Sequence, residues 1–281
     1  MTAQLLGLVL AGGRSTRMQR DKAALQYRDG QTQLAAAVAA LRPFVADVFV
    51  SVRADQRDDS TRREFKQIVD QIDSAGPIAG ITAAQAEHPQ AAWWVLACDL
   101  PFLDSATLEH LATQRDALCD ATAYRSSHDG LPEPLCAIYE PRSREPLAAF
   151  LAAGRQCPRK FLLQANTRLL AAPHAHAPDN ANTSEDYWQA MAKLNPTQAD
   201  TARDIHVQYF ALLREQAGRR EQTLTTTART PRELYDELRQ QYPFTLSPDV
   251  LRVAVNGEFA DWSRPLSTAD AVVFIPPVAG G

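Results

Sequence analysis

The sequence predicts a doubly wound, mostly parallel α/β sheet domain followed by a small α+β domain. Over the first two thirds of the chain, short apolar segments alternate with stretches of helical periodicity. Strands dense in apolar residues and separated by helices are typical of a parallel sheet that is covered on both faces. Beyond a polar stretch at 194–204, which we interpret as a linker, short strand patterns flank a single helix. The predicted domains are therefore 1–193 and 205–281.

Four apolar segments are the predicted strands of the first domain, and they read LLGLVLA (5–11), DVFVSV (47–52), QIVD (67–70) and WWVLAC (93–98). Between them, the segments QTQLAAAVAALRPF and PIAGITAAQAEH repeat apolar residues at helical spacing. Trp93 and Trp94 precede a fully apolar run, so we expect both in the core. In a sheet of this kind, ligands bind beyond the carboxyl ends of the strands.

The second domain is predicted from four strand patterns and one helix. The strands read IHVQYFALL (205–213), EQTLTT (221–226), LRVAVNG (251–257) and AVVFIPP (271–277), with a turn at AGRR before the second. The helix TPRELYDELRQQY begins with Thr230 as N-cap and Pro231 at its first position, and Glu233 completes a capping box. This order of elements predicts a small α+β roll.

Composition excludes several classes of protein. With 281 residues, 45% of them hydrophobic, the chain has room for two domains with real cores. The formal charge of −4 is spread evenly, which argues against nucleic acid as the main partner. No apolar run reaches membrane-spanning length, and the N-terminus lacks the pattern of a signal peptide. We expect no membrane association.

The four cysteines indicate a reducing environment. Cys98, Cys119, Cys136 and Cys157 are far apart and form no C-x-x-C pair, which argues against a zinc site or a disulfide framework. Their usage favours a reducing cytoplasm, and we expect a cytoplasmic protein in which they are small core residues.

A glycine-containing segment follows the first predicted strand directly and reads LAGGRSTRMQRDK (10–22). At Gly12 and Gly13 the backbone N–H groups can approach a phosphate that side chains would block. Arg17 adds a flat guanidinium fork and Lys22 a mobile point charge. The segment is neither a Walker A loop nor G-x-G-x-x-G. It predicts a phosphate-binding loop, and the alternative is a tight turn with basic surface residues.

A second signal lies in VLACDLPFL (95–103), where Asp99 stands just beyond an apolar strand. Mg²⁺ takes one or two protein carboxylates and completes its octahedron with waters and phosphate oxygens. Asp99 facing a phosphate-binding loop fits that role. The alternative is that Asp99 only begins a turn before Pro101.

Residues 5 to about 190 resemble the molybdenum cofactor guanylyltransferases, the MobA family. The resemblance rests on the loop above together with GPIAG (76–80), CDLPF (98–102) and NANTSEDY (180–187), in the family's order. It implies a Rossmann-like nucleotidyltransferase fold and transfer of GMP from GTP to the terminal phosphate of molybdopterin. Mg²⁺ would be required and pyrophosphate released.

The resemblance also implies roles for individual residues. Nucleotide contacts would come from the loop and from a later carboxylate, at Leu10, Ala11, Gly12, Gly13 and Asp70. Lys22 would hold the phosphates, and Asp99 would bind the metal. Contacts to the pterin phosphate would come from Arg17, Asn180 and Asn182.

Two positions depart from the family pattern. Gln19 stands where the family has glycine, so the loop has no glycine-only backbone angle there. Arg53 follows the second strand, where the family has a small polar residue such as asparagine near the base. The first departure bears on loop geometry and the second on guanine selectivity.

Residues 205–281 resemble the small subunit of molybdopterin synthase, the MoaD family, which has a ubiquitin-like β-grasp fold. The resemblance rests on VQYFALLRE (207–215), AVNGEF (254–259) and LSTADAVVFIPPVAGG (266–281). It implies that the Gly281 carboxylate is adenylated with ATP by an activating enzyme of the MoeB family and then becomes a thiocarboxylate. The sulfur would pass to the pterin precursor in the large synthase subunit, of the MoaE family.

The terminal segment suits that role. Glycines without Cβ can thread narrow channels in two partners, and Pro276 and Pro277 stiffen the exit from the last strand. One departure lies in STADAVV, where Ala269 replaces a turn glycine and Ala271 an acidic residue. This predicts a less well-formed turn and the loss of any contact made by the acidic side chain.

Two other features are expected to be structural. The motif HAH (174–176) has metal-like spacing without an apparent third ligand, so we expect a surface loop. The charged segment RADQRDDSTRREFK (53–66) is expected to be a solvated loop and helix face.

The leading hypothesis is a bifunctional fusion of a guanylyltransferase with a sulfur carrier. One alternative is a transferase that uses CTP or a sugar phosphate. A second is an inactive first domain that acts as a scaffold for the carrier. For the second domain, the alternative is a sulfur carrier of thiamine synthesis.

Overall fold

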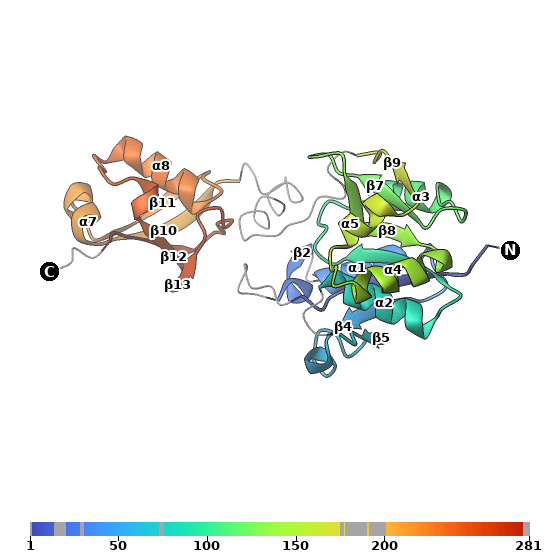
Figure 1. The fold of residues 1–281 in the computed structure, drawn as a ribbon. Coiled ribbons are helices and arrows are strands. Elements are labelled where there is room, and N and C mark those ends of the chain that lie inside the picture. The colour runs from blue at the N-terminus through green and yellow to red at the C-terminus, as the bar shows by residue number, and fades with distance from the viewer. Residues whose placement is uncertain are drawn as a thin grey trace. The chain divides into compact units, whose positions relative to one another are not determined.

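The computed structural model describes residues 2–13, 21–28, 31–72, 76–174, 177, 190 and 201–277. The chain divides into two compact units, Met1–Ala181 and Asn182–Gly281 (Figure 1). Among the described residues, no helix has the length and apolar character needed to cross a membrane.

The first unit is built on a seven-stranded sheet in the order β5-β4-β1-β6-β8-β7-β9 (Figure 1). The strands are β1 Leu5–Leu10, β4 Val48–Val52, β5 Gln67–Val69, β6 Ala92–Ala97, β7 Ala121–Arg125, β8 Pro132–Tyr139 and β9 Thr167–Leu170. Neighbours pair in parallel except that β8 runs antiparallel to both β6 and β7. The predicted mostly parallel sheet is confirmed. A separate two-stranded ribbon joins β2 Gln26–Arg28 and β3 Gln31–Thr32.

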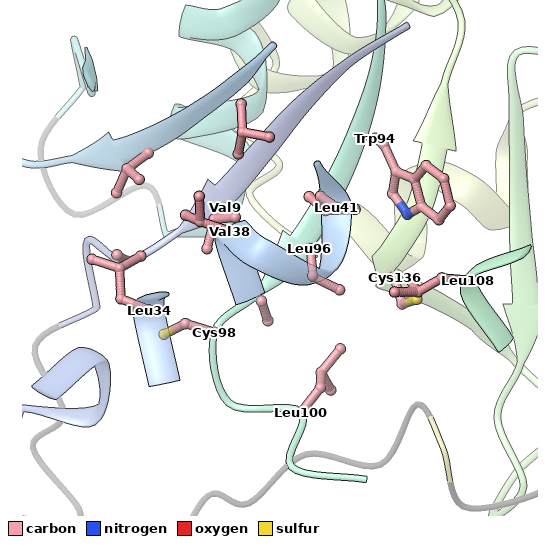
Figure 2. Packing of buried hydrophobic residues seen from close by; sticks show 14 of the residues in the cluster. Val9, Leu34, Val38, Leu41, Trp94, Leu96, Cys98, Leu100, Leu108 and Cys136 are labelled. Atoms are coloured by element: carbon pink, nitrogen blue, oxygen red, sulfur yellow. The ribbon is translucent and has the colours of Figure 1, made fainter. Parts of the chain in front are cut away.

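Helices cover both faces of this sheet. They are α1 Gln33–Leu41, α2 Pro77–Glu87, α3 Ser105–Thr113, α4 Arg144–Ala152 and α5 Pro158–Gln164, with 3-10 turns η1 Lys22–Ala24, η2 Ala54–Gln56 and η3 Pro141–Ser143. On one face, Leu34, Val38 and Leu41 of α1 belong to one core cluster together with Val9 and Trp94 (Figure 2). On the other, α2, α4 and α5 pack in a second cluster that includes Trp93.

The two tryptophans show why both faces are apolar. Successive side chains of a strand point to opposite sides of the sheet. Trp93 therefore lies in one core cluster and Trp94 in the other, and both are 0% exposed. The prediction that they belong to the core is confirmed.

The cysteines are all free thiols, and they do not share one environment. Cys98 and Cys136 are buried, as expected. Cys119 is half-buried and Cys157 is exposed, so the expectation of four core residues is wrong for these two. Both lie outside the strands: Cys119 precedes β7, and Cys157 is the N-cap of α5.

The second unit holds a five-stranded sheet in the order β11-β10-β14-β12-β13. Its elements are β10 Arg203–Tyr209, α7 Ala211–Ala217, β11 Glu221–Thr226, α8 Pro231–Gln241, η5 Pro248–Val250, β12 Arg252–Val255, β13 Glu258–Ala260 and β14 Ala271–Ile275. The central pair β10 and β14 is parallel, and the other pairs are antiparallel. Leu234, Tyr235 and Leu238 of α8 pack on the sheet beside Phe274, which completes the expected β-grasp fold (Figure 1).

The prediction of one strand over 205–213 is wrong at its carboxyl end. The strand β10 stops at Tyr209, and α7 follows from Ala211. Leu213 and Ala217 are four residues apart and both buried, which is helical spacing. Gly218, with φ of 66°, then ends the helix in the left-handed conformation. At its other end, β10 begins at Arg203, within the stretch interpreted as a linker.

The N-terminus of α8 follows the predicted capping box only in part. The Thr230 side chain accepts a hydrogen bond from the backbone N–H of Glu233 at 3.2 Å, as predicted. The Glu233 carboxylate, however, accepts from the backbone N–H of Arg229 at 2.7 Å, one residue before the N-cap. The Glu233 carboxylate also forms an ion pair with the Arg229 guanidinium. It is therefore directed toward residue 229 and not toward the N-cap residue, Thr230.

The turn that leads into β14 is formed, contrary to the expectation from STADAVV. Ser267 N–H donates to the Asp270 carboxylate at 2.8 Å, and Asp270 N–H donates to the Ser267 carbonyl at 3.1 Å. The Asp270 carboxylate also accepts from the Asn256 amide at 2.8 Å. Ala269 meets the requirements of this turn with φ of 69°, a conformation that L-residues other than glycine disfavour.

We predict that Ala269→Gly stabilises the second unit by about 1 kcal/mol, because glycine adopts this backbone angle without a Cβ penalty. Chemical unfolding of the full chain, followed by hydrogen exchange at the amides of β10, β12 and β14, measures it for the second unit alone. Ala271→Gly is the matched control and should destabilise, because position 271 lies in an extended strand. A loss of stability with Ala269→Gly would contradict the strain at this position.

Candidate functional site

The candidate site lies where four parallel strands end. The register pairs Leu10 of β1 with Ala97 of β6 on one side and with Ser51 of β4 on the other. It pairs Val52 of β4 with Val69 of β5. The segments that follow these strands therefore leave the sheet at the same edge and at the same level.

The residues that follow these strands come from distant parts of the sequence. Gly12 follows β1 by two residues and lies close to Arg53, which follows β4, and to Asp70, which follows β5. Asp99 follows β6, the neighbour of β1 on the other side, by two residues and lies in a turn. The glycine loop thus leaves the sheet between strands that are each followed by a carboxylate or an arginine.

Gly12 lets the Asp70 carboxylate approach the loop closely. A Cβ at this position would lie 3.1 Å from Asp70 Oδ2 and 3.7 Å from Arg53 Cγ. The first distance is shorter than ordinary van der Waals contact, so a larger side chain would displace the carboxylate. A Cβ at Gly13 would meet no described atom within 4 Å. A side chain at position 12 would therefore require a small shift of Asp70, whereas one at position 13 would meet none of the described atoms.

Ser51 holds Asp70 in place. The Ser51 hydroxyl donates to Asp70 Oδ1 at 2.6 Å, and Ser51 is itself 2% exposed. Gly80 in α2 makes room for this serine, because a Cβ there would lie 2.3 Å from Ser51 Oγ. The second glycine of GPIAG thus belongs to the support of Asp70.

Asp70 is in an environment that disfavours its charge. Burial raises the pKa of the Asp70 carboxyl above its ordinary value of 3.8, and the Ser51 hydrogen bond and the Arg53 charge offset this only in part. A buried carboxylate with spare acceptor capacity at a loop edge is suited to accept hydrogen bonds from a ligand.

Arg53 crosses the same edge. Its Nη1 donates to the Gly12 carbonyl oxygen, while Nε and Nη2 donate to the two carboxylate oxygens of Asp55 at 2.9 and 3.0 Å. The residue that departs from the family pattern thus contacts the glycine loop directly. Its effect on guanine selectivity stays a prediction.

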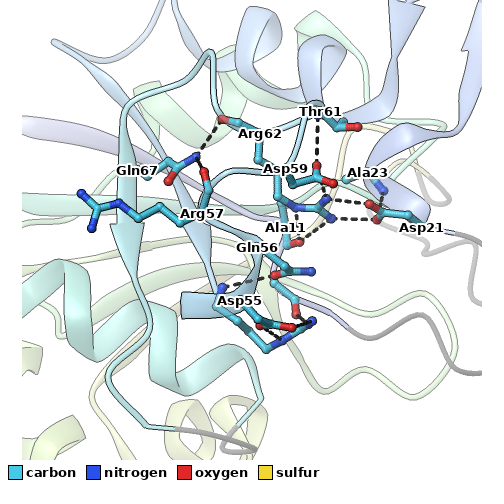
Figure 3. Close-up of polar contacts among 12 residues, drawn as sticks. Ala11, Asp21, Ala23, Asp55, Gln56, Arg57, Asp59, Thr61, Arg62 and Gln67 are labelled. Atoms are coloured by element: carbon cyan, nitrogen blue, oxygen red, sulfur yellow. Dashed lines mark hydrogen bonds and ion pairs between the residues drawn. The ribbon is translucent and has the colours of Figure 1, made fainter.

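Arg62 is a residue of the site that was not predicted from the sequence. The expectation that 53–66 is a solvated segment is wrong here, because Arg62 is 1% exposed. Its Nε and Nη2 donate to the Ala11 carbonyl oxygen at 3.0 and 2.9 Å (Figure 3). Its Nη1 and Nη2 also donate to the Asp21 carboxylate at 2.6 and 2.7 Å. These partners lie 51 and 41 residues away, so no local pattern could have revealed them.

The Asp21 carboxylate is held as an anion by this contact. Burial raises the pKa of Asp21, but the hydrogen bonds and charge of Arg62 outweigh that effect, so the pKa falls below 3.8. Asp21 Oδ1 also accepts from the backbone N–H of Ala23 at 3.1 Å. The carboxylate therefore fixes the turn η1, which begins at Lys22.

The structure describes the other predicted site residues only in part. Asp99 lies directly beyond β6 and is half-buried. Lys22 opens η1, and its backbone position alone is described. The remaining predicted site residues lie outside the described ranges, namely Arg17, Asn180, Asn182 and Gly281, as does Gln19.

The HAH motif shows one contact in the described part of the chain. His174 is exposed, and its Nδ1 lies 2.5 Å from Oδ2 of Asp104, the N-cap of α3. His176 lies outside the described ranges. No cluster of three or more His, Cys, Asp or Glu side chains suited to a metal ion occurs among the residues described.

We predict that Asp70→Asn raises the free energy of unfolding at pH 7. Since the pKa of Asp70 is higher in the folded state, ionisation above pH 3.8 favours the unfolded chain, and the amide removes that cost. The gain should vanish below pH 3.8. Urea unfolding at pH 3.5 and pH 7 measures both values.

Asp47→Asn provides a control of opposite sign. The hydrogen bond from Lys66 lowers the pKa of Asp47, so its charge stabilises the fold above pH 3.8 and this contribution is lost as the pH falls through the lowered pKa. This variant should lose stability at pH 7. A pH-independent effect of Asp70→Asn would refute the burial argument.

Comparisons with known proteins were made for both parts of the chain. The family model described as "MobA-like NTP transferase domain" matches residues 7–169, and the model of the ThiS family matches residues 207–281. A "Probable molybdenum cofactor guanylyltransferase" from Opitutus terrae is 34% identical over 210 residues, covering 72% of this chain and 96% of that protein.

A "Molybdenum cofactor biosynthesis bifunctional protein" from Synechocystis is 34% identical over 185 residues, which cover 66% of this chain. The match spans about half of that relative, 53% of its length. Among solved structures, molybdopterin-guanine dinucleotide biosynthesis protein A from Archaeoglobus fulgidus superposes with a TM-score of 0.56. It is 25% identical and covers 68% of this chain and 99% of its own.

The parallel sheet with its glycine loop, the family model over residues 7–169 and the full-length relatives agree. The chain belongs to the MobA-like NTP transferase family, and it carries a ThiS-like β-grasp domain at residues 207–281.

Proposed function

We propose that the first unit transfers GMP from GTP to the phosphate of molybdopterin and releases pyrophosphate. The observation that carries this proposal is the close approach of Asp70 to Gly12 at the edge of the sheet where β6, followed by Asp99, also ends. Support comes from the relative named a guanylyltransferase, of which this chain spans 96%.

The glycine loop and the half-buried Asp70 carboxylate are proposed to contact different parts of the nucleotide. At Gly13 no described atom lies within 4 Å of the Cβ position, which suits close approach of phosphates to the loop backbone. Asp70, held by Ser51, has acceptor capacity for N–H or O–H groups of the nucleoside. Leu10 and Ala11 line the start of the loop, and Lys22 supplies charge for the phosphates.

A magnesium ion fits the donor set. Mg²⁺ takes one or two protein carboxylates and fills its other positions with waters and phosphate oxygens. Asp99, two residues beyond the carboxyl end of β6, is such a carboxylate, and β6 pairs with the strand β1 that leads into the glycine loop. The ion would supply positive charge to the phosphate oxygens.

The reaction asks little covalent chemistry of the protein. The molybdopterin phosphate attacks the α-phosphorus of GTP as the bond to pyrophosphate breaks. The chain's own part is to position both reactants and to stabilise charge with loop N–H groups, Lys22 and Arg17. Asn180, Asn182 and Arg17 are proposed contacts of the pterin phosphate. No covalent enzyme intermediate is needed.

We propose that the second unit is a sulfur carrier. The strand β14, which ends at Ile275, is paired on both sides by β10 and β12, so the chain beyond it starts from a rigid base. Pro276 and Pro277 follow, and the remaining residues read VAGG. The Gly281 carboxylate would be adenylated by an activating enzyme of the MoeB family, become a thiocarboxylate and deliver sulfur in a MoaE-type subunit.

The domain limits and the cellular setting are part of the same proposal. The proposed domains are a transferase domain over 1–193 and a carrier domain over 205–281, joined by a linker over 194–204. The last two positions of that linker, 203 and 204, belong to the strand β10. GTP, molybdopterin and reduced thiols place the work in the cytoplasm.

We predict that the full chain releases pyrophosphate from GTP with Mg²⁺ and molybdopterin, and that Asp99→Ala lowers the rate at least about 100-fold by removing the metal-binding carboxylate. A coupled phosphate assay measures the rate. Chelation with EDTA should abolish it, and added Mg²⁺ should restore it.

Asp129→Ala, on the exposed β7–β8 hairpin where Asp129 pairs with Arg159, is the control and should keep full activity. Preference for CTP over GTP would overturn the guanylyl proposal. An inactive wild type with authentic molybdopterin would favour the scaffold alternative.

We predict that ATP and the activating enzyme add the mass of AMP to the intact chain with release of pyrophosphate. With a sulfide donor, AMP is then displaced, and the chain gains only the mass difference between one sulfur and the oxygen that it replaces. Deletion of Gly280 and Gly281 should abolish both changes. Intact-mass spectrometry measures these shifts in mass. The deletion should leave GMP transfer unchanged, and Asp99→Ala should leave the tail modification unchanged. Equal modification of the deleted chain contradicts the carrier proposal, and sulfur transfer only to a thiazole-forming partner would favour thiamine synthesis.

A further inference from the structure

We propose that Arg62 is a positioning residue for nucleotide binding, and that it acts by joining the two ends of the glycine-loop segment. This inference rests on the proposed nucleotidyl transfer. Arg62 holds the immediate neighbours of Gly12 and Lys22, which are Ala11 and Asp21.

The protein framework fixes the guanidinium before any ligand arrives. Arg62 lies between η2 and β5, where its carbonyl oxygen accepts from the Gln67 side chain at 3.0 Å. Its backbone N–H donates to the Asp59 carbonyl oxygen at 3.0 Å. Asp59 Oδ1 accepts from Nη1 at 2.9 Å, so one edge of the group is held by its own turn (Figure 3).

The other contacts of the guanidinium reach into the site. Ala11 immediately precedes Gly12, and Asp21 immediately precedes Lys22. Both Nε and Nη2 bind the Ala11 carbonyl oxygen, and Nη1 and Nη2 bind the two oxygens of Asp21. A planar fork can satisfy both partners at once, which a lysine ammonium does not.

The contact has an energetic consequence for ligand binding. Without it, Ala11 and Asp21 have to be brought together when the nucleotide binds, and the entropy lost is subtracted from the affinity. With it, one guanidinium already holds both residues. Because Arg62 is 1% exposed, these hydrogen bonds are also less screened than those of surface ion pairs.

A purely structural role for Arg62 makes a different prediction. If Arg62 only stabilised its own turn, loss of either carboxylate partner would have the same effect. Asp21 and Asp59 allow a matched comparison, since each accepts from Nη1 and their side chains are 36% and 37% exposed. Only Asp21 belongs to the loop segment.

The test compares Asp21→Asn with Asp59→Asn in the full chain, using Mg²⁺ and GTP as the probe in isothermal titration calorimetry. We expect Asp21→Asn to weaken GTP binding about tenfold, because a neutral amide loses the charge-assisted bidentate contact. Asp59→Asn should stay within about twofold of wild type. In steady-state assays, the KM for GTP should rise in Asp21→Asn while the KM for molybdopterin stays unchanged.

Arg62→Lys extends the test, with thermal unfolding to check that the variant is folded. It should resemble Asp21→Asn in GTP affinity, since a retained charge without the fork does not restore the contact. Hydrogen exchange without nucleotide should quicken at least about fivefold at Ala11, Gly12 and Ala23 in Asp21→Asn only.

Two results would overturn the inference: wild-type GTP affinity in Asp21→Asn, or equal losses in Asp21→Asn and Asp59→Asn. Failure of the proposed function is seen separately, in the wild-type chain. If the wild type binds no GTP, guanylyl transfer and the role of Arg62 in it both fall. If it binds GTP and the two variants do not differ, only the role of Arg62 falls.

Discussion

The in-register parallel pairing of β1 with both β4 and β6 is the constraint on which the first unit depends. Parallel strands that start at one level also end at one level, so the residues beyond them are delivered to a common edge. The register brings the segments that follow β1, β4 and β6 to that edge, and the hydrogen bond from Arg53 to the Gly12 carbonyl oxygen adds a direct contact between two of them. The apolar helices on both faces make the arrangement rigid, since each strand is buried on two sides.

Around this edge, small residues and buried polar groups are arranged at some cost to stability. Gly80 leaves room for Ser51, Ser51 holds Asp70, and Gly12 lets Asp70 reach the loop. Burial keeps the Asp70 charge unfavourable in the folded chain. A carboxylate kept in such a place is typical of a group retained for ligand binding, where activity and stability oppose each other. The Arg62–Asp21 contact works in the opposite sense, because it satisfies both charges and closes the segment beforehand.

In the second unit, the packing of a helix on a sheet supports the strand that precedes the terminal glycines. Its helix α8 packs on a sheet whose central pair is β10 and β14, so the strand that precedes the terminal glycines is paired on both sides. The core is independent of the first unit, with Leu234, Tyr235 and Phe274 at its centre. Two domains with separate cores can therefore carry separate activities on one chain.

The sequence by itself determined eight strands, β1, β4, β5, β6, β10, β11, β12 and β14, the helices α1, α2 and α8, and the order of the motifs at the strand ends. The strands β7 to β9 and the helices α3 to α5 were not predicted. The predicted elements follow from local periodicity and from glycine and proline positions, which neighbouring residues set. It did not reveal α7, because a short helix beside a strand shares its apolar residues with the strand pattern. It predicted a poor turn at Ala269, whereas the hydrogen bonds of Asp270 hold that turn and leave the strain at the alanine. Only the tertiary structure decided the role of Arg62, because a charged residue in a charged segment is buried or solvated according to partners brought from distant parts of the chain.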